Sequence, residues 1–149
     1  MIKTSLCEFA DRMLESNHIG EPDVQELQRT ILPDGIMSQD QADVLIALDR
    51  AVPSQHPSWS RHLTAAVVEF AVWTSRPTGR IDVETARWLA ASLGCGSGPS
   101  DTAARIAFEI VQEAERVDEV LLAFALRAAE KRIARERPAR DRSFERFAG

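Results

Sequence analysis

The imidazole and thiol side chains of this chain that could bind a transition-metal ion are those of three histidines and two cysteines. His56 and His62 are neighbouring imidazoles, but six residues of a helix turn them about 240° apart. Two histidine ligands on one helix need a separation of three or four residues, so this pair does not converge. Cys7 and Cys95 lie far apart in the sequence and form no CxxC motif. We therefore predict no metal site and no cofactor.

The sequence contains no motif typical of an enzyme. It lacks a Gly-x-Ser-x-Gly elbow, a phosphate-binding glycine loop and a His-Glu-x-x-His helix. Ser5, Cys7 and Cys95 have no adjacent base in the sequence. Because residues distant in sequence can still meet in a folded site, this interpretation rests on motifs alone. On that basis we predict a protein that is not an enzyme.

Two similar stretches, residues 33–42 and 77–86, lie 44 positions apart in the middle of the chain. The aligned residues include Pro33 with Pro77, Gly35 with Gly79, Asp40 with Glu84, and Ala42 with Ala86. In each copy a helix should end at the proline, and the glycine should form a tight turn with positive φ. Ser38 and Asp82 are then placed to cap the following helix. The two stretches therefore predict tandem helix-loop-helix units.

Each linker resembles the second half of an EF-hand loop, with Met37 and Ile81 at its eighth position. Calcium needs oxygen ligands at the first, third, fifth and twelfth positions. One carboxylate occurs among the eight residues found there, which are Thr30, Leu32, Asp34, Gln41, Thr74, Arg76, Thr78 and Thr85. We therefore expect two ion-free, EF-hand-like loops that lie back to back and join near Met37 and Ile81. Their structural residues are Gly35, Met37, Gly79 and Ile81.

Length and composition indicate one soluble, mainly helical domain. The chain has 149 residues, of which 44% are hydrophobic and 28% are charged, and it contains no tyrosine. Abundant Ala, Leu, Glu and Arg favour helix over sheet. No apolar run approaches the roughly 18 residues of a membrane span, and the N-terminus lacks the pattern of a signal peptide. The two distant cysteines are typical of reduced thiols, so we predict a cytoplasmic protein.

The spacing of apolar residues predicts an all-α bundle of about seven helices in a single domain. We expect helices over residues 4–16, 22–32, 38–51, 58–74, 82–93, 100–115 and 118–136. The helix over 58–74 is apolar nearly all round and should be central, with Trp59 and Trp73 in the core. The apolar series runs through residues 115–117 without a phase break, so one long helix is the alternative to the turn that we favour there.

We divide the chain into a helical domain over residues 1–137 and a charged, flexible tail over 138–149. The domain would contain EF-hand-like units at about 20–51 and 58–94, followed by a helical pair at 100–136. Residues 131–149 carry seven basic and three acidic side chains, a net charge of +4, against −9 for the rest of the chain. The body should repel nucleic acid, which leaves only the tail to attract it.

The basic residues of the tail, interleaved with two phenylalanines, form a possible phosphate-binding segment. They are Arg135, Arg137, Arg140, Arg142 and Arg146. Basic runs of this kind bind nucleic acid or anionic lipid. The acidic residues within the tail dilute its charge and favour the alternative, a solvated chain end.

Trp88 lies off the apolar stripe of its predicted helix, at the position where the first copy has Val44. Two alternatives explain an apolar residue on this second face of equivalent helices. The two helices could pack against each other there, or the face could form an interaction surface for a partner. Intramolecular packing is the alternative that we favour.

A helical chain with two degenerate EF-hand-like units resembles the tellurite-resistance-B-like group of small bacterial proteins. The residues that carry the resemblance are Asp34 to Ser38 with Ala42, and Thr78 to Asp82 with Ala86. The resemblance implies a metal-dependent stress response based on clustered acidic residues, a cluster that this chain lacks. Our leading hypothesis is a non-enzymatic protein that acts through contacts with an unknown protein partner or with itself. Metal-responsive stress protection and nucleic-acid binding through the tail are the alternatives.

Overall fold

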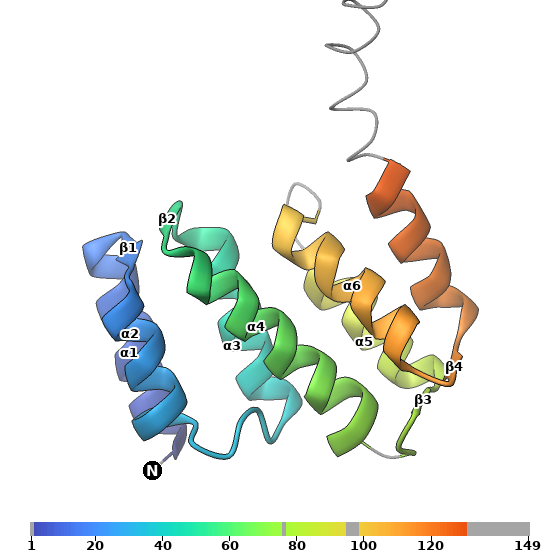
Figure 1. Cartoon of the computed structure of the whole chain (residues 1–149), viewed down its shortest axis with the longest axis horizontal. Helices are drawn as coiled ribbons and strands as arrows, with labels where there is room; N and C mark the ends of the chain where they lie inside the picture. Colours follow the sequence, from blue (N-terminus) through green and yellow to red (C-terminus); the bar gives the residue numbers. More distant parts are fainter. Residues whose placement is uncertain (1, 76, 95–98, 131–149) are drawn as a thin grey trace, which may run out of the picture.

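Helices predominate in the computed structural model, which describes residues 2–75, 77–94 and 99–130 (Figure 1). They are α1 (Ile2–Ser16), α2 (Glu21–Glu26), α3 (Gln39–Ala51), α4 (Pro57–Val68), α5 (Val83–Leu93), α6 (Asp101–Glu113) and a last helix over residues 119–130. α2 and α4 continue as π-helical turns at Leu27–Ile31 and Glu69–Thr74. The prediction of a helical bundle is confirmed, and so is the break near residues 115–117. No helix of the described residues is long and apolar enough to cross a membrane.

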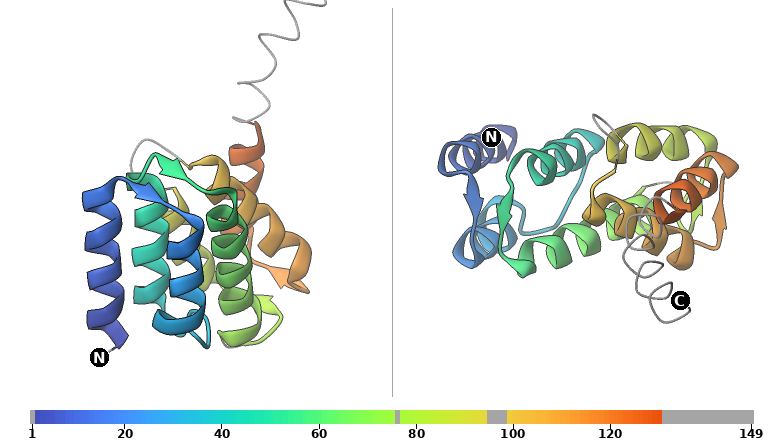
Figure 2. Two further views of the ribbon diagram at one scale, coloured as in Figure 1. Left: turned by 60° about the vertical axis from the view of Figure 1, so that its left-hand side comes forward. Right: turned by 90° about the horizontal axis from the view of Figure 1, so that it is seen from above.

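The helices form two layers, and the helices of one layer run antiparallel to those of the other (Figure 1). α1, α3 and α5 pack side by side in one layer, and α2, α4 and α6 in the other (Figure 2). Contacts of α3 with α4 and of α5 with α6 join the layers. α4 lies in the middle of its layer, between α2 and α6, which explains why its sequence is apolar on several faces. Each helix therefore contacts mainly its neighbours along a short stack.

The two predicted linkers have the local geometry that their residues require. Gly35 and Gly79 adopt positive φ angles of 81° and 77°. The side chain of Ser38 accepts a hydrogen bond from the backbone N–H of Gln41, and Asp82 accepts one from Thr85. These bonds satisfy N–H groups that a helix start otherwise leaves unpaired. The expected turns and N-caps are therefore confirmed.

In the part of the chain that the structure describes, four two-residue strands interrupt the helices, although the sequence patterns indicate none. β1 (His18–Ile19) pairs in parallel with β2 (Ser54–Gln55), and β3 (Arg80–Ile81) pairs in parallel with β4 (Arg116–Val117). Each strand ends one residue before the N-cap of the next helix. A strand of two residues is too short for alternation of apolar and polar side chains to reveal it.

The expected junction between Met37 and Ile81 is wrong. Ile81 is buried and pairs with Val117 of β4, whereas the side chain of Met37 is 59% exposed. The backbone N–H of Met37 donates to the side-chain Oε1 of Gln41, so it needs no partner strand. The chain after α6 approaches Gly79 and Ile81 instead, because the backbone N–H groups of Glu115 and Asp118 donate to their carbonyls.

A constant offset of 62 positions relates the two halves of the described chain. It carries residue 18 of β1 to residue 80 of β3, Ser38 to Ser100 as helix caps, and residue 54 of β2 to residue 116 of β4. Pairs that are buried in both halves include Ile19 with Ile81, Leu27 with Leu89, Ile31 with Leu93, Leu48 with Ile110, and Trp59 with Leu121. The 44-residue shift seen in the sequence relates adjacent members of the stack, α2 to α4 and α3 to α5.

Of the two tryptophans predicted in the core, one is outside it. Trp59 is completely buried, as expected, but Trp73 is 41% exposed and its indole donates to Glu113. The π-helical turn at Glu69–Thr74 is the cause, since the extra residue in such a turn rotates later side chains relative to an α-helix. Phe70 and Val72 of that turn point inward instead.

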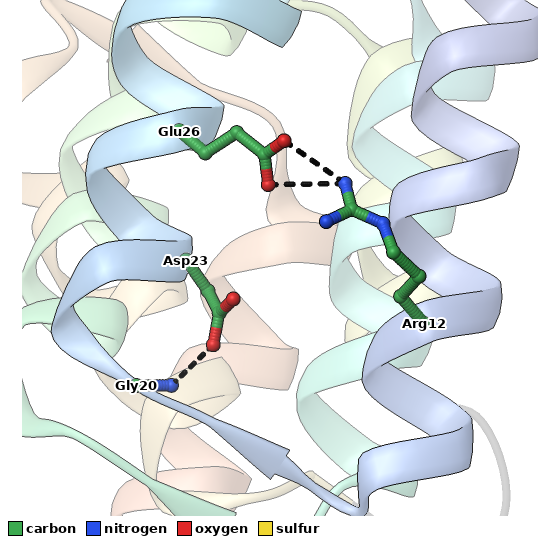
Figure 3. A network of polar contacts seen from close by, with 4 residues as sticks. All are labelled: Arg12, Gly20, Asp23 and Glu26. Atoms are coloured by element: carbon green, nitrogen blue, oxygen red, sulfur yellow. Dashed lines mark hydrogen bonds and ion pairs between the residues drawn. The ribbon is translucent and has the colours of Figure 1, made fainter.

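Polar contacts connect α1 with α2 and cap the start of α2 (Figure 3). A guanidinium nitrogen of Arg12 on α1 lies 3.0 Å from both carboxylate oxygens of Glu26 on α2. The carboxylate of Asp23 accepts a 2.9 Å hydrogen bond from the backbone N–H of Gly20, which caps the start of α2. The Arg12–Glu26 pair is exposed, so it contributes at most about 1 kcal/mol.

Candidate functional site

A groove of about 530 Å³ lies between α3 and α5. Its lining residues are Asp43, Ala47, Arg50 and Ala51 of α3 with Trp88, Ala91 and Ser92 of α5. Most of the surface that the groove presents is apolar. Ala47, Ala51 and Ala91 are exposed, so their small side chains leave the groove open to solvent.

Trp88 is held in the wall of this groove by contacts on two sides. Its indole Nε1 donates a 2.8 Å hydrogen bond to Oδ1 of Asp43. Its ring meets the ring of Phe70 edge to face, with centroids 5.9 Å apart and planes at 84°. The hydroxyl of Ser92 also donates to Oδ1 of Asp43, over 2.7 Å. Asp43 therefore fixes the position of the indole while the rest of the ring lines the groove.

Arg50 provides a positive charge on the same side of α3 as the carboxylate of Asp43. A guanidinium nitrogen of Arg50 donates a 2.9 Å hydrogen bond to the backbone carbonyl of Leu93 at the end of α5. A cation at this place is favourable, since the C-terminus of a helix carries partial negative charge. The groove thus combines an alanine floor and an indole with one anionic and one cationic residue.

A second depression, of about 490 Å³, adjoins the first on the other side of Ala91. It lies between α5 and the last helix and is lined by Ala90, Ala91, Gly94, Pro99, Phe124, Arg127 and Ala128. Because Ala91 lines both depressions, the hollow surface extends across α3, α5 and the last helix. The sequence gives one signal for it, namely alanines at solvent-facing helix positions.

The predicted interaction residues Val44 and Trp88 do not share one surface. Both are half-buried and pack against the core, and α3 and α5 pack together as the favoured alternative requires. Trp88 also lines the groove, whereas Val44 does not. Sequence comparison of the two helices therefore located one wall of the groove but missed Asp43, Arg50 and Ser92. The predicted phosphate-binding arginines, Arg135, Arg137, Arg140, Arg142 and Arg146, lie outside the described residues.

Each of the three histidines has a polar side-chain partner. Nδ1 of His18 lies 2.7 Å from the hydroxyl of Ser54, and Nδ1 of His56 lies 2.8 Å from that of Ser58. Nδ1 of His62 lies 3.2 Å from the amide nitrogen of Gln28, and partial burial lowers the pKa of His62. Within residues 2–75, 77–94 and 99–130 no three His, Cys, Asp or Glu side chains are grouped to hold a metal ion.

Comparisons with known proteins identify no relative of this chain. No family model, no curated protein and no solved structure matches the chain.

Proposed function

We propose that this chain is a non-enzymatic, cytoplasmic protein-interaction module that binds a helical segment of a partner protein in the groove between α3 and α5. The groove itself is the observation that supports the proposal. It is largely apolar, is large enough for several side chains, and lies on rigid, neighbouring helices. Amphipathic helices bind other proteins by placing their apolar face in such grooves.

The chemistry of the lining residues suits a helix as ligand. Alanines at positions 47 and 51 lie one helical turn apart and would let the backbone of a ligand approach closely. Trp88 offers a large, fixed apolar ring, and tryptophan is enriched among residues that dominate binding energy. Asp43 and Arg50 differ in charge and would orient a ligand that carries complementary charges.

A large side chain that fills the groove should weaken the binding of a helical ligand. We expect peptides selected from a phage-displayed library on the immobilised wild-type protein to bind the Ala47→Trp variant about tenfold more weakly or worse, a loss of about 1.4 kcal/mol. The indole would occupy the space between α3 and α5 where the ligand lies. Fluorescence polarisation of labelled peptides measures the two dissociation constants.

The matched control is Ala65→Trp, which places the same side chain at an exposed position of α4, in the other layer. This variant should bind the peptides as wild type does, and circular dichroism should show both variants folded. Selected peptides that bind Ala47→Trp and wild type equally would contradict the proposal.

A metal-responsive role, implied by the tellurite-resistance-B-like resemblance, is the second candidate. The linkers that carry the resemblance have the positive φ angles and helix caps expected of EF-hand-like loops, which favours it. If the role is correct, calcium, manganese or zinc should raise the melting temperature, since a ligand at 100 times its Kd adds about 2.7 kcal/mol. Melting curves that are identical with each metal and with EDTA would rule it out.

A further inference from the structure

One end of the helical stack exposes large apolar side chains. Phe108 on α6 is 52% exposed, and on the last helix Leu122 is 37% and Leu126 is 65% exposed. The stack ends at these two helices in the described chain (Figure 1). We call Phe108, Leu122 and Leu126 the open edge.

The 62-residue offset relates each residue of the open edge to an equivalent residue in the first half of the chain. Phe108 corresponds to Ile46 of α3, which is 4% exposed, and α3 has α5 as its next neighbour. Leu126 corresponds to Thr64 of α4, which is 3% exposed. Leu122 corresponds to Ser60, whose hydroxyl lies 3.0 Å from that of Thr102 on α6. The three positions of the open edge are therefore buried or half-buried in the first half of the chain.

The opposite end of the stack, formed by α1 and α2, has a different surface composition. The exposed residues on α1 and α2 from Cys7 to Thr30 include one large aliphatic side chain, that of Leu14, which is 50% exposed. Most of the others are charged or polar: Glu8, Asp11, Arg12, Glu15, Glu21, Gln25, Gln28 and Arg29. Stacked helical proteins need such polar faces at their ends to remain soluble. The open edge lacks this protection, so we infer that another segment covers it.

We propose that residues 131–149 of the same chain cover the open edge. The segment follows Glu130, which is the last described residue of the helix that carries Leu122 and Leu126. Its sequence contains Phe144 and Phe147, two large apolar residues for an apolar surface. Its net charge of +4 is matched by residues 101–130, which carry seven acidic and three basic side chains.

The segment is long enough to make this contact. Leu122 lies eight residues before Glu130, about 12 Å along the helix. The thirteen residue-to-residue steps from 131 to 144 can span up to roughly 43 Å when extended. Phe144 can therefore return to Leu122 and Leu126.

Paramagnetic relaxation in the full-length protein tests the proposal. A nitroxide attached to Ala148→Cys, with Cys7 and Cys95 changed to serine, should broaden the backbone resonances of Phe108, Leu122 and Leu126. Resonances of α1 and α2 should keep their intensity. Adding Phe144→Ser and Phe147→Ser to the labelled protein should restore the signals of the open edge.

Three results would overturn the proposal. The first is unbroadened signals at the open edge in the labelled protein. The second is broadening that persists after both phenylalanines are changed, because the apolar contact would then play no part. The third is equal broadening in a mixture of spin-labelled and isotope-labelled chains, which would assign the open edge to a second copy. The groove between α3 and α5 takes no part in this experiment, so its outcome is independent of the proposed peptide binding.

Discussion

Replacing Asp49 with alanine should lower the free energy of unfolding by about 3 kcal/mol. Asp49 is buried on α3, where Oδ1 accepts a 3.1 Å hydrogen bond from the indole of Trp59 and Oδ2 accepts a 3.0 Å bond from the hydroxyl of Ser100. Ser100 in turn caps α6, so one carboxylate joins three helices. Alanine would leave the fully buried indole N–H without an acceptor. Urea denaturation should show a lower midpoint with an unchanged slope.

Asp49→Asn is the matched variant, since it keeps the shape of the side chain and one carbonyl oxygen for the indole. We expect it to lose less than half as much stability as Asp49→Ala. Asp11→Ala, at an exposed position of α1, should change the free energy of unfolding by no more than about 0.5 kcal/mol. An Asp49→Ala protein as stable as wild type would show that the buried network contributes little to the fold.

Gly94→Ala should destabilise the protein by about 2 kcal/mol, because the added methyl has no room. A Cβ atom at this position would lie 2.8 Å from the carbonyl oxygen of Ala90 and 2.8 Å from Cε2 of Phe124. Phe124 belongs to the last helix, so the glycine permits that helix to approach the end of α5. Thermal denaturation followed by circular dichroism measures the effect.

A second background separates the clash with the ring from the clash with the backbone. In a Phe124→Leu protein, whose shorter side chain removes the ring carbon, Gly94→Ala should cost clearly less than in wild type. The double-mutant cycle should therefore give a favourable coupling energy between the two substitutions. Equal costs in both backgrounds would mean that the last helix does not depend on Gly94 for its close approach.

Local features of the fold were predictable from neighbouring residues. The caps at Ser38 and Asp82, and the positive φ angles of Gly35 and Gly79, depend on groups within about four positions. The ends of α3 and α5 were predicted to within one residue for the same reason. Trp73 was misplaced because a π-helical turn leaves no signature in apolar spacing.

The candidate site was predictable only in part. Trp88 was predicted as a possible interaction residue because it lies off the apolar stripe of its helix, and it lines the groove. Its acceptor Asp43 lies 45 positions earlier, and nothing in the local sequence connects the two. In the sequence, the alanines beside them are typical of any helix. Only the packing of α3 against α5 shows that they line an open groove.

Capping, turn chemistry and apolar periodicity act over a few residues, so the starts and ends of helices could be predicted from the order of residues alone. The stacking of those helices depends instead on contacts between segments that are distant in the chain. Two strand pairings join segments about 36 positions apart: β1 pairs with β2, and Ile81 pairs with Val117 rather than with Met37. The groove and the open edge arise from the same long-range packing, since a hollow or an uncovered face exists only between helices already in place.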